Sequence, residues 1–164
     1  MNKAIVIIGG GPVGLIFALL NQINGLDTLI LESKSENKSL DDRRGLALSN
    51  GSRFILERIG VWEELVDKLT AIESIHTSQK GTFGRTLMKA KEFNQDALGY
   101  IVSYGVLIGV LQEKLKKSKK INILYNTKAS QFIIKGEKNC LKYHKQEKEY
   151  DLLFDLLVLA DGGN

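Results

Sequence analysis

The stretch from Ile5 to Gly14 constrains this chain more than any other. It reads Ile-Val-Ile-Ile-Gly-Gly-Gly-Pro-Val-Gly, so an uncharged apolar run leads directly into a Gly-x-Gly-x-x-Gly pattern with glycines at positions 9, 11 and 14. A continuously apolar run is typical of a parallel strand that is covered on both faces. Pro12 suits the first turn of a following helix, because its φ angle is already helical and its missing N–H would lack a partner there. The stretch therefore predicts a strand, a tight turn and a helix in succession.

The start of such a helix is chemically suited to a phosphate group. Backbone N–H groups and the positive end of the helix dipole point toward a ligand there. In this scheme Gly9 makes the tight turn, Gly11 lets a phosphate approach the backbone, and Gly14 lets the helix pack closely on the strand. These three glycines and Pro12 are the predicted pyrophosphate site.

Glu32 supports the same interpretation. It follows the next predicted strand, Thr28–Leu31, where a carboxylate can accept hydrogen bonds from both hydroxyls of an adenosine ribose. A 2′-phosphate would be repelled by this carboxylate, which argues against NADP at this site. The strand, turn, helix and carboxylate together predict dinucleotide binding, and NAD and FAD both satisfy the pattern.

No charged residue stands between Lys3 and Asp27, so a signal peptide or a membrane span has to be considered. Three consecutive glycines and Pro12 interrupt the apolar run, whereas a span needs about 20 mostly apolar residues. A buried strand, a turn and a buried helix explain the stretch better.

The rest of the chain continues the alternation of strands and helices. With 164 residues and 43% hydrophobic composition it has the size of one domain. Helices are predicted over 12–24, 49–59, 61–69 and 106–117, with Gly25 ending the first and Ser49 capping the second. Strands are predicted over 4–8, 28–31, 121–124, 129–135, 140–144, around 150, and over 156–160. Residues 33–42 are predicted as a surface loop, and short strands are predicted within 72–103. The pieces over 129–150 are expected to form an antiparallel meander that covers one face of a parallel sheet.

Charge and cysteine content exclude several function classes. The net charge of +4 comes from lysines late in the chain, but acidic residues are interspersed and no aromatic platform accompanies them, so no nucleic-acid partner is predicted. A single cysteine, Cys140, excludes an intrachain disulfide and fits a reducing compartment such as the cytoplasm. His76 and His144 are interpreted as packing or surface residues, and no metal-ligand spacing is present.

Several separated segments resemble those of flavoprotein aromatic monooxygenases of the p-hydroxybenzoate hydroxylase type. They are Asp42–Ser49, Arg58–Trp62 and Leu156–Gly162, the last of which resembles the Asp-Gly motif of that family. Three further segments look like the ubiquinone-biosynthesis hydroxylase branch: Ile75–Ser78, Gly81–Thr86 and Leu98–Val102. Several separated matches that follow one another in the same order as in the family identify it more specifically than any single match does.

The resemblance assigns roles to individual residues. It implies that the glycine turn holds the pyrophosphate of FAD and that Glu32 holds the adenosine ribose. Arg44 would contact the phosphate region, where a guanidinium is chemically apt. Asp161 and Gly162 match positions that contact FAD and NAD(P)H. Near Gly105 the family often has a basic or polar residue before the helix, and Tyr104-Gly105 departs from that pattern, so no role is carried over there.

The resemblance also implies a fold. It predicts an α/β, Rossmann-like FAD-binding fold with a central parallel sheet, a β-meander and the start of a substrate-domain sheet. Residues 1–164 are expected to be the N-terminal part of an FAD-binding domain, with 72–103 as an excursion toward the substrate-binding sheet. Family members continue into most of that sheet and a later Gly-Asp motif, whereas this sequence stops at Asn164, inside the Asp-Gly motif. The chain is therefore expected to be inactive alone.

In the intact family, NAD(P)H reduces FAD, and dioxygen then hydroxylates a phenol ring. The resemblance implies a polyprenylated phenol of ubiquinone biosynthesis as substrate, and such a tail indicates peripheral contact with the inner face of a membrane. The sequence identifies no catalytic residue and no oligomeric state. Two alternatives stay open: an NAD-dependent dehydrogenase that uses the same turn, and a non-catalytic dinucleotide-binding module.

Overall fold

The computed structural model describes residues 2–81, 83–135 and 138–162. Thr82 and Asn164, which belong to the motifs quoted above, lie outside the described residues. The chain divides into two compact units, Met1–Asp41 with Ile108–Asn164 and Asp42–Leu107. Each unit has at least one sheet of its own.

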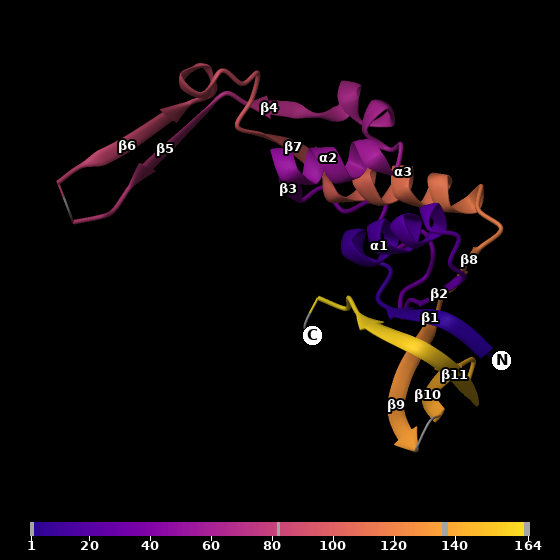
Figure 1. The fold of residues 1–164 in the computed structure, drawn as a ribbon. Helices are drawn as coiled ribbons and strands as arrows, with labels where there is room; N and C mark the ends of the chain where they lie inside the picture. The colour runs from indigo at the N-terminus through magenta and orange to yellow at the C-terminus, as the bar shows by residue number, and fades with distance from the viewer. Residues whose placement is uncertain (1, 82, 136–137, 163–164) are drawn as a thin grey trace. The chain divides into compact units, whose positions relative to one another are not determined.

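A six-stranded sheet forms the first unit, in the order β8-β2-β1-β11-β10-β9 (Figure 1). Strand β2 pairs in parallel with both β1 and β8, and β1 pairs in parallel with the end of β11. The predicted parallel sheet, with the strand over 121–124 as a member, is therefore confirmed. The strands are β1 (Asn2–Ile8), β2 (Thr28–Leu31), β8 (Ile121–Leu124), β9 (Thr127–Lys135), β10 (Lys138–Lys145) and β11 (Lys148–Leu159).

Strand β11 joins the parallel and antiparallel parts of this sheet. Its first half pairs antiparallel with β10, which in turn pairs antiparallel with β9, and its second half pairs in parallel with β1. The meander is thus present, but the prediction of separate strands around 150 and over 156–160 is wrong. They are one strand of 12 residues, because the first half pairs with β10 and the second half with the distant β1, and the two pairings continue into each other.

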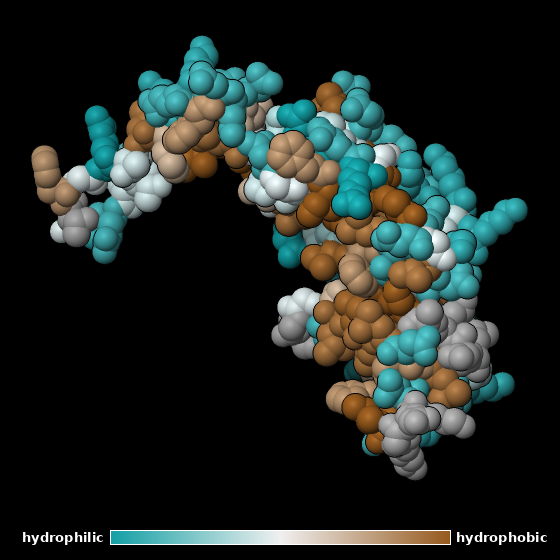
Figure 2. All heavy atoms as spheres, in the orientation of Figure 1, coloured by the Kyte–Doolittle hydropathy of each residue, from teal (hydrophilic) through white to brown (hydrophobic). Residues whose placement is uncertain are grey.

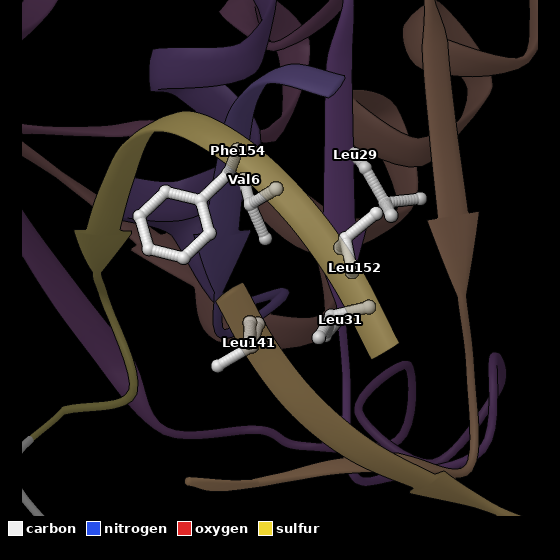
Figure 3. Close-up of a cluster of buried hydrophobic side chains, with 6 residues drawn as sticks. All are labelled: Val6, Leu29, Leu31, Leu141, Leu152 and Phe154. Atoms are coloured by element: carbon white, nitrogen blue, oxygen red, sulfur yellow. The ribbon is translucent and has the colours of Figure 1, made fainter. Parts of the chain in front are cut away.

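A buried apolar cluster holds the meander against the parallel strands. Its members are at most 8% exposed, and burying a side chain of this size contributes about 1.5–3 kcal/mol. The meander therefore covers one face of the parallel strands, as predicted, although its strands also belong to the same sheet. Figure 3 shows the six side chains: Val6 of β1, Leu29 and Leu31 of β2, Leu141 of β10, and Leu152 and Phe154 of β11.

Helix α1 (Pro12–Ile23) packs on strand β1 from the other side. Side chains alternate along a strand, so Ile5 and Ile7, which are also buried, point away from Val6. The helix ends at Ile23 with Asn24 as its C-cap, and Gly25 after it has φ +75°, a left-handed conformation that suits the predicted glycine at the helix end. A second helix, α3 (Tyr104–Lys116), begins in the second unit and ends in the first.

The second unit contains a three-stranded sheet and a two-stranded sheet. The first has the order β3-β7-β4, and the second pairs β5 with β6. Short strands within 72–103 are thus confirmed; the expectation that they reach toward a substrate-binding sheet stays a prediction. The elements are β3 (Gly45–Ser49), α2 (Asn50–Arg58), η1 (Trp62–Glu64), η2 (Val66–Lys68), β4 (Thr70–Ile72), β5 (Ser74–Ser78), β6 (Arg85–Lys89), η3 (Ala90–Phe93) and β7 (Gly99–Ser103).

Helix α2 begins as predicted, because the Ser49 hydroxyl accepts a hydrogen bond from the N–H of Ser52. The predicted helix over 61–69 is wrong: the segment forms two 3₁₀ turns. Trp62 and Leu65 are both buried, and their spacing of three residues suits a 3₁₀ turn rather than an α-helix. Strand β3 was not predicted, because its pairing with β7 is a long-range contact.

The surface of the first unit is partly apolar. Figure 2 shows brown, apolar side chains gathered on this part of the molecule, and the exposed apolar residues include Phe132 and Ile134 of β9 and Leu156 and Leu159 of β11. Among the described residues, no helix is long and apolar enough to cross a membrane. Within the same residues, no cluster of histidine, cysteine and acidic side chains could hold a metal ion.

Candidate functional site

The glycine turn lies where β1 ends, between β2 and β11. Gly9 has φ +110°, which side chains rarely allow, and its N–H donates to the carbonyl of Leu31 over 2.9 Å. A Cβ atom on Gly9 would stand 2.3 Å from the carbonyl oxygen of Ala160, the residue that follows β11. Position 9 must therefore be glycine for two reasons, its backbone angle and the close approach of a neighbouring strand end.

Gly14 brings helix α1 close to this turn. A Cβ atom at position 14 would stand 2.1 Å from the carbonyl oxygen of Gly9 and 3.3 Å from Cγ2 of Ile7. Only glycine allows the helix to pack at this distance from the strand.

The start of helix α1 is open to a ligand. Gly11 is the N-cap, Pro12 follows in the first turn, and no side chain caps the N-terminus. The first N–H groups of a helix have no partner within the helix. The first turn also carries no acidic residue that would repel an anion, and Val13 beside it is 70% exposed.

Glu32 faces this turn from the end of β2. Its Oε2 accepts a hydrogen bond of 2.6 Å from the N–H of Gly10. Its Oε1 accepts one of 2.7 Å from the N–H of Lys34 and one of 3.3 Å from the Ser33 hydroxyl. The carboxylate is thus held by backbone donors on both oxygens and stands beside the glycine turn.

Asp161 and Gly162 follow β11 at the same edge of the sheet. The backbone nitrogen of Asp161 would be 2.8 Å from a Cβ atom on Gly9, and the N–H of Ala160 donates to the carbonyl of Ile8 over 2.7 Å. Gly162 has φ +83° and open space where a side chain would be. The first unit thus brings together Gly9, Gly11, Pro12, Gly14, Glu32, Asp161 and Gly162.

Arg44 belongs to the second unit. Its guanidinium forms an ion pair with Asp42 at 2.6 Å and lies 5.1 Å from the ring centre of Tyr104. The hydrogen bonds and charge of Asp42 raise the pKa of the Arg44 guanidinium. The side chain is 74% exposed, so it is a fixed cation that a further anion can reach.

Two residues of this site were not predicted. Gly10 donates to Glu32, and a Cβ atom on Gly10 would stand 2.9 Å from Oε2 of that carboxylate. The signal was present, since three glycines follow one another where the motif requires only the first and third. The backbone carbonyl of Ala160 lies directly against Gly9. No sequence pattern would have indicated that contact.

FAD fits these residues. An uncapped helix start, a turn that side chains would fill, and a carboxylate aimed at that turn match the needs of a diphosphate and an adjoining ribose. All of these residues belong to the first unit.

Known proteins are similar to this chain over nearly its whole length. One curated relative, the uncharacterized protein slr1300 of Synechocystis sp., is 27% identical over 158 residues, which cover 96% of this chain and 38% of that protein. Another, the FAD-dependent monooxygenase ntnA of Nectria sp., is 29% identical over 168 residues, which cover 96% of this chain and 21% of that protein. The solved structure of OxyS anhydrotetracycline hydroxylase from Streptomyces rimosus matches with a TM-score of 0.82 at 18% identity, over 99% of this chain and 32% of that chain.

The present chain thus spans well under half the length of these relatives. The structural match at this identity shows the fold, a mixed α/β architecture with a central, mostly parallel sheet. The family model described as FAD binding domain matches residues 2–164. The chain belongs to the FAD binding domain family.

Proposed function

We propose that this chain is the FAD-binding part of a flavin-dependent aromatic monooxygenase. The observation that carries the proposal is the carboxylate of Glu32, held 2.6 Å from the N–H of Gly10 at the start of an uncapped helix. The family match favours FAD over NAD as the dinucleotide. A nicotinamide-dependent dehydrogenase is therefore the weaker alternative.

In this proposal each residue binds or orients the cofactor. The first turn of α1, from Gly11 to Gly14, receives the diphosphate, and Glu32 accepts hydrogen bonds from the adenosine ribose. Only the resemblance assigns a phosphate contact to Arg44 of the second unit, and its exposed guanidinium is chemically suited to one. Asp161 and Gly162 contact the cofactor from the end of β11.

When bound, FAD supplies the redox chemistry with dioxygen that no protein side chain can provide. The residues described here have the simpler task of fixing where the cofactor lies. Glu32 needs no rearrangement for this task, because three donors already hold its two oxygens in place.

We further propose a phenol with a polyprenyl tail, on the route to ubiquinone, as the substrate of the whole protein, with NAD(P)H as reductant. The support is the resemblance of Ile75–Ser78, Gly81–Thr86 and Leu98–Val102 to that branch. Ile75–Ser78 lies in β5, a strand that is exposed throughout. A tail of this kind would bring the protein into peripheral contact with a membrane surface.

The test is a turnover assay of the protein encoded by the natural reading frame that contains these residues. The protein is supplied with FAD, a prenylated phenol, dioxygen and either NADH or NADPH. We expect phenol-dependent oxidation of the reductant and one added oxygen atom in the product by mass spectrometry. Reductant oxidation without a hydroxylated product for any phenol would overturn the proposed monooxygenase activity.

A variant pair connects the assay to the site. Glu32→Ala should raise the FAD concentration needed for half-maximal activity by about tenfold or more, since hydrogen bonds to a charged group contribute roughly 1.5–3 kcal/mol. Glu113→Ala is the control, because this exposed glutamate of α3 contacts Lys116 and not the glycine turn. Equal FAD requirements in the two variants would remove Glu32 from the site.

A further inference from the structure

We propose that a slot in the first unit binds a small planar aromatic acid. The slot lies between strands β2 and β8 on one side and the β10–β11 hairpin on the other. Its volume is about 490 Å³, within the roughly 300–1,000 Å³ typical of ligand pockets. It is lined by Leu29, Asn122, Ile123, Leu124, Tyr143, Lys145 and Tyr150.

One wall of the slot is aromatic. Tyr143 and Tyr150 are partners across β10 and β11, and their rings are stacked with centres 5.3 Å apart and planes 18° from parallel. Tyr150 is 42% exposed, so the stack is not enclosed by the protein. Burial, and to a smaller extent the neighbouring Tyr150, raise the pKa of Tyr143. The Tyr143 hydroxyl therefore stays neutral at physiological pH and does not repel an anion.

The opposite wall is aliphatic. Leu29 is 2% exposed and belongs to the core cluster of Figure 3, and the half-buried Leu124 packs against the same cluster. At Leu141 and Leu152 the meander packs directly on the parallel strands. At Tyr143 and Tyr150, further along the same hairpin, the space between hairpin and parallel strands stays open and forms the slot. A flat ring between the two walls would extend the tyrosine stack and cover the aliphatic side chains, which favours an aromatic ligand.

A cation at the slot favours a negatively charged ligand. Lys145 is half-buried, and the described residues offer no acidic side chain as its ion-pair partner. Lys142 on the same strand differs, because it contacts Glu149 at 2.6 Å and Asp151 at 3.3 Å. Lys148, the cross-strand neighbour of Lys145, carries the same charge but does not line the slot. An acid group on the ligand would provide the partner that Lys145 lacks.

The slot is separate from the glycine turn. No residue of Gly9–Gly14 lines it, nor does Glu32. Leu29 precedes Glu32 on β2 by about 10 Å, at roughly 3.3 Å per residue. Binding at the slot is therefore independent of the proposed FAD function, and the two can succeed or fail separately.

The experiment is a titration of the chain with 2-naphthoate, followed by ligand fluorescence and by methyl resonances of leucine and isoleucine. We expect saturable binding of one equivalent, with shifts at Leu29 and Leu124, whose side chains lie on the slot face of β2 and β8. Lys145→Gln should weaken binding by about tenfold, as expected for a lost charge-assisted hydrogen bond. Tyr150→Leu should weaken it about threefold or more, because one ring of the stack is lost.

Two controls make the result specific. Lys148→Gln removes the same charge from the neighbouring position, which does not line the slot, and should change the affinity less than twofold. The neutral analogue 2-naphthalenemethanol should bind weakly and equally to the wild type and Lys145→Gln. Absence of saturable binding, equal affinity in the two lysine variants, or displacement of naphthoate by FAD would each overturn the proposal.

Discussion

At the scale of single residues, close backbone contacts determine the amino acids of the turn. Gly9 and Gly14 each lie where a Cβ atom would meet a carbonyl oxygen, at 2.3 and 2.1 Å. Such contacts involve backbone atoms, which cannot move aside as a flexible side chain can. The identity of these residues is thus a requirement of packing before any cofactor binds.

Gly14→Ala should consequently lower the stability of the chain. We expect a loss of about 1–3 kcal/mol in the free energy of unfolding, the usual range for overpacking. The matched control is Gly51→Ala in helix α2, where a Cβ atom would meet only the Ser49 hydroxyl at 3.5 Å. That substitution should be neutral or stabilise by up to about 1 kcal/mol, since alanine favours helices over glycine. Urea unfolding of both variants checks the difference, and equal stabilities would refute the packing argument.

At the scale of elements, the sequence predicted what depends on neighbours along the chain. Strand β2, helix α1 with its glycine end, and the Ser49 cap of helix α2 all follow from local patterns. Strand β3 and the length of β11 did not follow, because both depend on partners far away in the sequence.

The same division applies to the site. The sequence predicted Gly9, Gly14 and Glu32 from a motif with known spacing, and all three lie together at one sheet edge. It could not predict that Glu32 would be held by Gly10 or that Ala160 would lie against Gly9, since those contacts arise only when three strand ends meet.

The meander has one buried face and one exposed face. A substitution on the buried face should therefore lower the free energy of unfolding more than a substitution on the exposed face. Leu141→Ala should cost about 2–5 kcal/mol of unfolding free energy, because Leu141 is 1% exposed within the cluster. Phe132→Ala, its cross-strand neighbour on β9, is 61% exposed and should cost far less. Thermal or urea unfolding gives both values; a larger loss for Phe132→Ala would contradict the assignment of the core.

At the scale of the whole molecule, two half-buried tyrosines predict how stability changes with pH. Burial and the charge of Glu36 raise the pKa of Tyr125, and burial raises the pKa of Tyr143. A phenol with a raised pKa holds its proton longer in the folded chain than in the unfolded chain. Its contribution is therefore complete below the ordinary value near 10 and is lost as the pH rises through the folded value.

Urea unfolding at pH 8 and at about pH 10.5 measures this effect. The wild type should lose stability over the interval, and the double variant Tyr125→Phe with Tyr143→Phe should lose less, because phenylalanine has no proton to lose. Lysine ion pairs titrate in both proteins and cancel in the comparison. An identical loss in the two proteins would show that the tyrosines do not contribute.

The central claim is that the start of helix α1, together with Glu32, binds the diphosphate and ribose of FAD. Equilibrium titration of the 164-residue chain with FAD, followed by calorimetry, tests it most directly. We predict one bound FAD per chain, no measurable binding for Gly11→Val, binding weakened about tenfold or more for Glu32→Ala, and unchanged binding for Glu113→Ala. Wild-type affinity in both Gly11→Val and Glu32→Ala would contradict the claim.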